Sequence, residues 1–189
     1  MSEAATSPSP VKTSRWVMDK AHSSIWFSAK QLGISTIRGW FREFEVDLQV
    51  EGEKPEAAKI EAKIDASSLD TGNDFRDRHL RGPDFLDVEH YPSITFRSSR
   101  VVPVTEGRLR MEGDLTIRDA TRPVALAVEF HGFATGMAGE RRVAFTAQTR
   151  INRTEWGLTW NVPIADALLV SEDIELTIDV SFAEETAEQ

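Results

Sequence analysis

Alternation of hydrophobic and polar residues is the dominant pattern of the chain and recurs in eight segments. In "FEVDLQV", for example, Phe44, Val46, Leu48 and Val50 would share one face of an extended segment, with polar residues on the other face. Alternation of this kind predicts β-strands that have one buried face and one solvent-exposed face. The same pattern recurs in "SIWFSA", "KIEAKIDA", "ITF", "RLRMEGDLTIR", "VALAVEF", "VAFTAQTRI" and "IELTIDVSF".

These segments predict about eight strands, joined by turn signals such as "TEG", "RDATRP" and "TGMAGE". One buried face per strand favours an antiparallel sheet over a doubly wound parallel one. So many half-buried strands need either a second sheet or closure of the sheet on itself. Closure also removes exposed edges, so an antiparallel barrel accounts for the pattern well.

Several residues on the predicted inner face are small. In one interpretation they make room for large neighbours, as in any packed core. In the other, protein side chains do not fill the interior, and an eight-stranded barrel is just wide enough to hold a small ligand. Such a ligand would have to be apolar. The small residues are Ala29, Ala62, Ala66, Gly113 and Ala147.

One segment, "NDFRDRHLRGP", breaks the alternation and predicts a helix of about two turns. Asn73 is a suitable N-cap, and Gly82 followed by proline is a stop signal. So short a helix is not stable alone and must dock on the barrel, where it is well placed to cover an open end. The helix also carries two acid–base pairs at i, i+4 spacing, Asp74 with Arg78 and Asp77 with Arg81.

Recognised catalytic and metal-binding motifs are missing from the sequence. It contains no G-x-S-x-G, P-loop or G-x-G-x-x-G motif. The two histidines in this region, His79 and His90, lack the spacing of a zinc site, so no metal site is predicted. A cluster of Asp77, His79 and His22 at an open end of the barrel would be the basis for an enzyme, which is the alternative hypothesis.

The composition limits the kinds of molecule that the chain is expected to bind and the compartment in which it is expected to lie. The chain has 189 residues, a net charge of -9 and no cysteine. The charge argues against a general affinity for nucleic acid or an anionic membrane surface. Disulfides, thiolate catalysis and cysteine-ligated zinc are excluded. No apolar run approaches the ~20 residues that span a bilayer, and "MSEAATSPSPVKTSR" does not look like a secretory signal, so a cytoplasmic location is expected.

The chain is expected to form one domain with two short tails. Residues 1–14 are rich in serine, alanine and proline without periodicity, which predicts a disordered tail. Residues 15–183 form the predicted barrel domain, and residues 184–189 a polar C-terminal tail. A homodimer is the default expectation for the oligomeric state.

Four stretches of the sequence resemble the YceI-like family of polyisoprenoid-binding proteins. They are "WVMDKAHSSIWFSAKQLGISTIRGWF", "NDFRDRHLRGPDFLDVEHYPSITFRS", "GDLTIRDATRPVAL" and "RINRTEWGLTW", and the resemblance covers about residues 15–183. It implies an extended, lipocalin-like, eight-stranded antiparallel β-barrel, with a short helix in an insertion near one end. It also implies a long isoprenoid or similar lipid along the barrel axis. Many members are periplasmic, in contrast to the location expected here.

The resemblance and the alternation together predict the residues that contact a ligand. For each residue near the head group, a purely structural role is the alternative. The candidates for the head group at the open end are His22, Arg38, Trp40, Arg76 and His79. The candidates for the apolar tail are Phe27, Ala29, Phe44, Ala62, Ile64, Phe75, Leu80, Phe85, Phe96, Met111, Leu115, Phe145 and Trp156.

The predicted function is non-enzymatic binding of a long-chain apolar ligand, as a carrier, store or sequestering protein. No cofactor is required, although an isoprenoid quinone or a polyprenyl lipid is expected to co-purify. Two alternatives stand beside this prediction. One is an enzyme that acts on an isoprenoid lipid at the barrel end, and the other is a ligand-free stress or scaffold protein whose barrel is filled by its own side chains.

Overall fold

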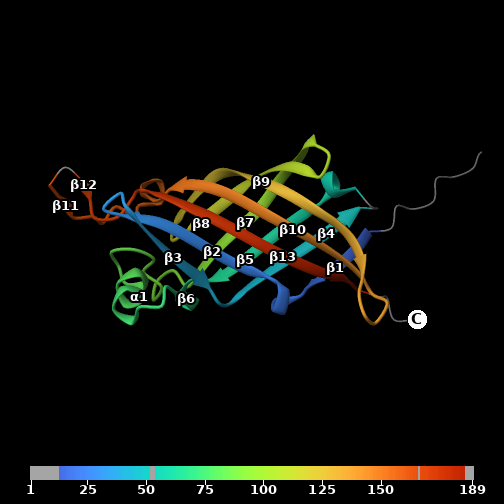
Figure 1. The fold of residues 1–189 in the computed structure, drawn as a ribbon, viewed down its shortest axis with the longest axis horizontal. Coiled ribbons are helices and arrows are strands. Elements are labelled where there is room, and N and C mark those ends of the chain that lie inside the picture. Colours follow the sequence, from blue (N-terminus) through green and yellow to red (C-terminus); the bar gives the residue numbers. More distant parts are fainter. Residues whose placement is uncertain (1–12, 52–53, 166, 186–189) are drawn as a thin grey trace, which may run out of the picture.

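Eight antiparallel strands close into a barrel in the computed structural model, which describes residues 13–51, 54–165 and 167–185 (Figure 1). The ring order is β1-β4-β5-β7-β8-β9-β10-β13, and pairing of β13 with β1 completes it. The predicted fold class is therefore confirmed. The ring strands are β1 (Thr13–Met18), β4 (Phe44–Glu51), β5 (Lys59–Asp65), β7 (Ser93–Thr105), β8 (Arg108–Ile117), β9 (Ala120–Thr135), β10 (Arg141–Asn152) and β13 (Asp173–Glu184).

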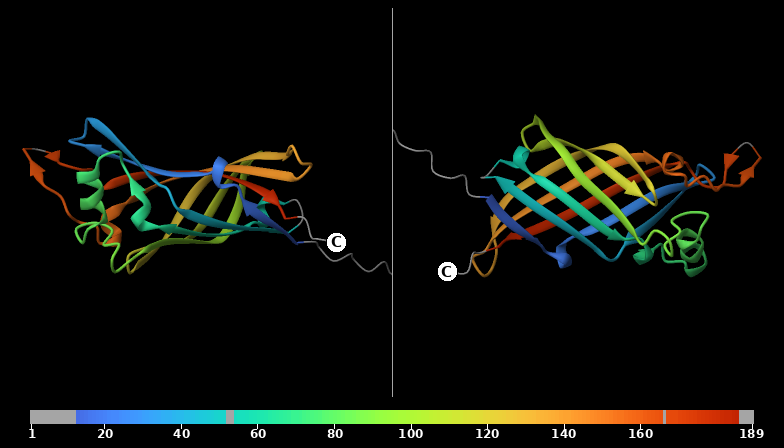
Figure 2. Two further views of the ribbon diagram at one scale, coloured as in Figure 1. Left: turned by 90° about the horizontal axis from the view of Figure 1, so that it is seen from below. Right: turned by 180° about the vertical axis from the view of Figure 1, so that it is seen from behind.

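Three further strands extend the sheet at one end of the barrel. β2 (Ser24–Gln31) pairs with the first half of β13, β3 (Ser35–Phe41) pairs with β2, and β6 (Leu69–Asp70) pairs with β3. The second half of β13 pairs instead with β1. The barrel is therefore closed where β1 lies. At the opposite end β2 and β3 diverge from β5, and the helix α1 lies there (Figure 2).

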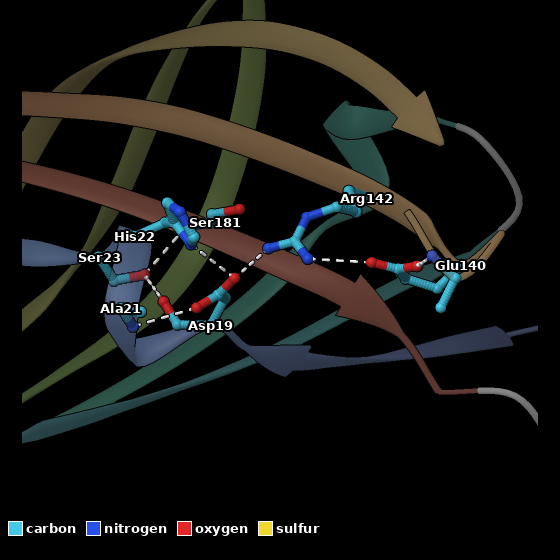
Figure 3. A network of polar contacts seen from close by, with 8 residues as sticks. Asp19, Ala21, His22, Ser23, Glu140, Arg142 and Ser181 are labelled. Carbon is cyan, nitrogen blue, oxygen red and sulfur yellow. Dashed lines mark hydrogen bonds and ion pairs between the residues drawn. The ribbon is translucent and has the colours of Figure 1, made fainter. Parts of the chain in front are cut away.

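A network of polar contacts holds the turn at which β1 gives way to β2, within the 3₁₀ helix η1 (Lys20–His22) (Figure 3). The Asp19 carboxylate accepts a hydrogen bond from the Ala21 amide (3.0 Å) and contacts His22 Nδ1 (2.8 Å). It also forms an ion pair with Arg142 of β10, whose Nη1 donates to Glu140 Oε1 (3.1 Å). The network thus ties η1 to β10, near the point where β13 changes its pairing partner from β2 to β1.

Asp19 is expected to make stability depend on acid pH. The hydrogen bond with His22, followed by that with Arg142, lowers the pKa of Asp19 from 3.8 to about 2. The ionised carboxylate therefore stabilises the fold fully above pH 3.8, and this contribution is lost as the pH falls through about 2. We expect Asp19→Asn to cost about 1 kcal/mol at pH 7, because the carboxylate is partly solvated. Urea unfolding should show this cost shrinking between pH 4 and pH 2; a cost that stays constant over that range contradicts the assignment.

The predicted inner faces are confirmed, but five strands escaped prediction: β1, β3 and the two-residue strands β6, β11 (Pro163–Ile164) and β12 (Ala167–Leu168). β4 buries Phe44, Val46, Leu48 and Val50, and β8 alternates in the same way. The alternation did not reveal β1 or β3. β3 contains Gly39, over which the Phe27 ring packs so closely that a Cβ atom would lie 2.4 Å from Phe27 Cζ. A glycine inside a short strand weakens the sequence signal for that strand.

The predicted helix is present as α1 (Asp74–Arg81), between Asn73 and Gly82. Asn73 Oδ1 accepts from the Arg76 amide (3.0 Å), which confirms the N-cap. The two predicted ion pairs within the helix are wrong. Asp77 turns inward and accepts from the Thr71 amide (3.0 Å), while Arg81 donates to a backbone carbonyl. Asp77 and Arg81 therefore bind the chain in and directly after β6, and not the solvated partners that their spacing suggests.

The chain ends agree only partly with the predicted tails. β1 begins at Thr13, two residues inside the predicted N-terminal tail, and the remainder of that tail lies outside the described residues. β13 ends at Glu184, and residues 186–189 also lie outside them. Disorder of the N-terminal tail stays a prediction. Within the described ranges, no helix has the length and the apolar character needed to cross a membrane.

Candidate ligand-binding site

The barrel encloses a cavity of about 250 Å³. Side chains from β2, β4, β5, β7–β10, β13 and α1 line it, and nearly all of them are apolar. The polar residues of the lining are Thr149, Arg76 and Arg153. The Thr149 hydroxyl is satisfied, because it donates to the Ala125 carbonyl (2.9 Å). Most of the cavity wall therefore offers a ligand only van der Waals contact and removal from water.

The small inward residues play two different roles. Gly113 makes room for a neighbour, since a Cβ atom there would lie 2.5 Å from Phe96 Cζ and 2.4 Å from the Arg97 carbonyl oxygen. Ala66 is buried but does not reach the cavity. The interior is thus packed tightly at these two positions and hollow elsewhere. The other small residues, Ala29, Ala62 and Ala147, line the cavity.

Aromatic side chains fill the barrel where β1 closes it. Trp16 lies 5.9 Å from Phe133 between ring centroids, and Phe130 packs against both Phe133 (5.4 Å) and Phe145 (5.5 Å). Phe182 is fully buried beside Phe145. Of these five rings, Phe145 lines the cavity. The aromatic cluster therefore forms the floor of the cavity. The opposite end of the cavity lies beneath α1.

The helix and the loop after it cover that other end. Leu80, Phe85 and Leu86 contribute to the cavity wall. His79 packs edge-on against Phe85 (5.2 Å) and Trp160 (4.5 Å), and its Nε2 contacts Asp84 Oδ2 (2.9 Å). The insertion thus lies where the sequence predicts it, over the open end, and is held there mainly by apolar and aromatic contacts.

A buried polar cluster ties the lid, which is formed by α1 and the loop after it, to Thr71, which follows β6 at the edge of the sheet. Asp77 is only 4% exposed and accepts hydrogen bonds from both the amide and the hydroxyl of Thr71. Arg76 Nε donates to the Thr71 hydroxyl (2.7 Å), and Arg76 Nη2 donates to the Thr71 carbonyl (2.9 Å). Thr71 therefore forms hydrogen bonds with both Asp77 and Arg76 of α1. These bonds fix the Arg76 side chain in the cavity wall.

Arg153, in the 3₁₀ helix η4 (Arg153–Trp156), is a cavity residue that the sequence interpretation missed. Its side chain is 4% exposed and lies over the Phe85 ring, 5.6 Å from its centroid. Burial lowers the pKa of Arg153, and the charge of Glu172 opposes this effect. The alternation contained the signal, because continuing the inward series past Ile151 places residue 153 on the inner face.

The structure brings only one of the five head-group candidates, Arg76, to the cavity wall. His22 contacts Asp19 at η1, and His79 packs behind Phe85. The remaining two, Arg38 and Trp40, alternate outward on β3, where Arg42 lies over the Trp40 ring (5.1 Å). A head-group role for His22, Arg38, Trp40 or His79 therefore has no support from their positions.

Three of the predicted tail residues lie off the cavity. Phe44 is buried beside Trp40 in a separate small pocket, and Phe75 points away from the barrel with 77% of its surface exposed. Trp156 is 2% exposed, but its indole Nε1 donates to the Leu115 carbonyl (3.0 Å) outside the lining. The predicted tail residues that line the cavity are Phe27, Ala29, Ala62, Ile64, Leu80, Phe85, Phe96, Met111, Leu115 and Phe145.

The cluster behind the enzyme alternative is not assembled. His22 belongs to the Asp19 network, Asp77 binds Thr71, and His79 contacts Asp84. Each of the three therefore has its own partners. Among residues 13–51, 54–165 and 167–185, no group of three or more histidine, aspartate and glutamate side chains is arranged to hold a metal ion.

Comparison with known proteins identifies the family. A family model described as the YceI-like domain matches residues 16–182. The chain belongs to the YceI-like family. A UPF0312 protein of Vibrio cholerae is 34% identical over 138 residues, which cover 73% of each chain. The resemblance inferred from the four sequence stretches is therefore confirmed.

Solved structures of other proteins share the fold. A Campylobacter jejuni YCEI protein superposes with a TM-score of 0.72 at 29% identity, covering 84% of this chain and 90% of its own. A polyisoprenoid binding domain from Saccharophagus degradans superposes with a TM-score of 0.62, covering 92% and 98% of the two chains. The latter is 13% identical, so that likeness concerns the fold alone.

Proposed function

We propose that this chain binds a long-chain apolar ligand, such as a polyisoprenoid, an isoprenoid quinone or a similar lipid, inside its barrel. It acts as a carrier or store and not as an enzyme. The observation that carries the proposal is the apolar cavity, which runs from the aromatic floor to the lid and is almost free of polar groups. The polyisoprenoid binding domain of Saccharophagus degradans, which has the same fold, also supports it.

The energetics of the cavity favour occupation. Without a ligand, the apolar side chains that line the cavity either face water or lack packing partners, and both states are unfavourable. A tail with about twenty buried carbons would contribute roughly 16 kcal/mol before the entropy of ordering it is subtracted. An apolar ligand therefore removes a penalty from the folded protein and gains burial for itself.

Binding is expected to raise the melting temperature. Delipidated protein should take up geranylgeraniol saturably, and ligand at about 100 times its Kd should raise the Tm by about 5–10 °C. Glycerol at the same concentration, which offers no apolar tail, serves as the control. If neither uptake nor a rise in Tm is found for any prenyl or fatty ligand, the ligand-free scaffold becomes the better account.

A further inference from the structure

Arg153 has a hydrogen-bond donor that the protein leaves unused inside the cavity wall. Its Nε donates to the Ser171 carbonyl (3.1 Å) and its Nη1 to the Leu158 carbonyl. Its Nη2 is buried and has no partner among the described residues. Buried donors are normally paired, and one left unpaired costs about 1–3 kcal/mol. We therefore expect Nη2 of Arg153 to have a hydrogen-bond partner that the described residues do not supply.

The charge of Arg153 is also uncompensated within the lining. Both charged residues that line the cavity, Arg76 and Arg153, are cationic, and the lining contains no aspartate or glutamate. Glu172, which does not line the cavity, acts on Arg153 through its charge, but no carboxylate of the described residues forms an ion pair with Arg153. Buried charges are normally paired, because removal from water is expensive. The cavity is thus apolar along its walls and positively charged at the lid end.

We propose that Arg153, supported by Arg76, binds an oxyanion, a carboxylate or phosphate, at the head of an apolar ligand. This inference rests on the proposed function and specifies the head group that the cavity takes. Guanidinium groups suit this task, since their forked donors match the oxygens of carboxylates and phosphates. The two carbonyls bound by Nε and Nη1 hold the Arg153 side chain in place, and Nη2 is left for the ligand.

The position of Arg153 allows one ligand to place its head group at the lid end and its apolar chain along the rest of the cavity. Phe85 lies in the wall beneath the Arg153 guanidinium, while Leu80 and Leu86 of the lid flank the same end. From there the apolar walls extend to Phe145 at the aromatic floor. A head group at Arg153 would therefore leave the apolar chain of the ligand along the barrel, in contact with carbon alone.

Matched ligands test the inference on the unaltered protein. Oleate is compared with oleyl alcohol, and geranylgeranyl phosphate with geranylgeraniol, by displacement titration at neutral pH. Each pair has the same tail, so the ratio of affinities reports the head group. We expect the oxyanion of the preferred pair to bind about 10- to 100-fold more tightly than its alcohol. The pair with the larger ratio distinguishes a carboxylate ligand from a phosphate ligand.

Variants assign the preference to Arg153. In Arg153→Met the preference for the oxyanion should fall to the small part that Arg76 supplies, while the alcohol still binds. Arg150→Met, which removes an exposed arginine of β10 that pairs with Glu175 (2.8 Å), should retain it. Arg153→Lys keeps the charge without the forked donors and should show an intermediate ratio. If a variant fails to fold, as judged by near-ultraviolet circular dichroism, the wild-type ratios still decide.

The outcomes separate this inference from the proposed function. Equal binding of oxyanion and alcohol by wild-type protein overturns the role of Arg153 and leaves lipid binding intact. An undiminished ratio in folded Arg153→Met overturns it as well. Failure of every ligand to bind, alcohols included, overturns the proposed function itself.

Discussion

Replacing Ala147 with phenylalanine is expected to abolish lipid uptake, lowering the affinity for geranylgeraniol by about 100-fold or more. Ala147 lines the cavity from β10, and its two cross-strand neighbours, Val128 and Ile178, line it as well. A phenyl ring there would occupy space that the ligand needs. Each methylene-sized group excluded from burial forfeits about 0.8 kcal/mol, so loss of about four such groups corresponds to roughly 100-fold in Kd.

The same substitution should leave the protein folded. Because the ring enters a hollow and not a packed core, the Tm of the unliganded variant should be equal to or higher than that of wild type. Ala127→Phe on the adjacent strand β9 is the matched control, since Ala127 is exposed and lies opposite Gln148 outside the barrel. Isothermal titration of both variants checks the prediction. Normal uptake by Ala147→Phe would show that the ligand does not occupy this part of the barrel.

Replacing Asp77 with alanine is expected to destabilise the chain by about 3 kcal/mol. The carboxylate accepts two hydrogen bonds from Thr71, and its removal leaves the buried Thr71 amide without an acceptor. The same change loosens the residue that positions Arg76 in the cavity wall. Loss of Asp77 should therefore weaken the lid as well as the fold.

Equilibrium unfolding in urea measures this effect, with Asp74→Ala as the control on the same helix. Asp74 is exposed in the first turn of α1, where removing its charge should cost only about 0.5 kcal/mol. Hydrogen exchange should also show faster opening of residues 74–86 in Asp77→Ala. Equal destabilisation by the two substitutions would mean that the buried cluster does not anchor the lid.

The sequence could predict the barrel because its signals are local. Strict alternation fixes which face of each strand is buried, and an N-cap and a stop signal fix α1 to the residue. The change in the pairing of β13 from β2 to β1, which takes place near η1, could not be predicted in this way. It depends on long-range contacts such as the ion pair between Asp19 and Arg142, which are 123 residues apart. For the same reason β1 and β3, which are weakly patterned, became visible only in the structure.

Prediction of the site succeeded where side chains follow strand alternation and failed where they do not. Met111 and Phe145 lie on the predicted inner faces and line the cavity. Phe75 and Trp156 lie in helical segments, where small rotations decide whether a ring faces the cavity. Arg153 was overlooked because a charged residue is not expected on an inner face. A charge that interrupts an inward apolar series is therefore worth examining as a ligand contact.

Native mass spectrometry of the delipidated protein, incubated with prenyl lipids and with oleate, shows directly whether a lipid binds inside the barrel. We expect a saturable one-to-one adduct with wild-type protein that is absent from Ala147→Phe and present in Ala127→Phe. Wild-type protein that keeps its bare mass at every lipid concentration would contradict ligand binding in the barrel. An adduct of equal intensity in Ala147→Phe would place the lipid elsewhere on the protein.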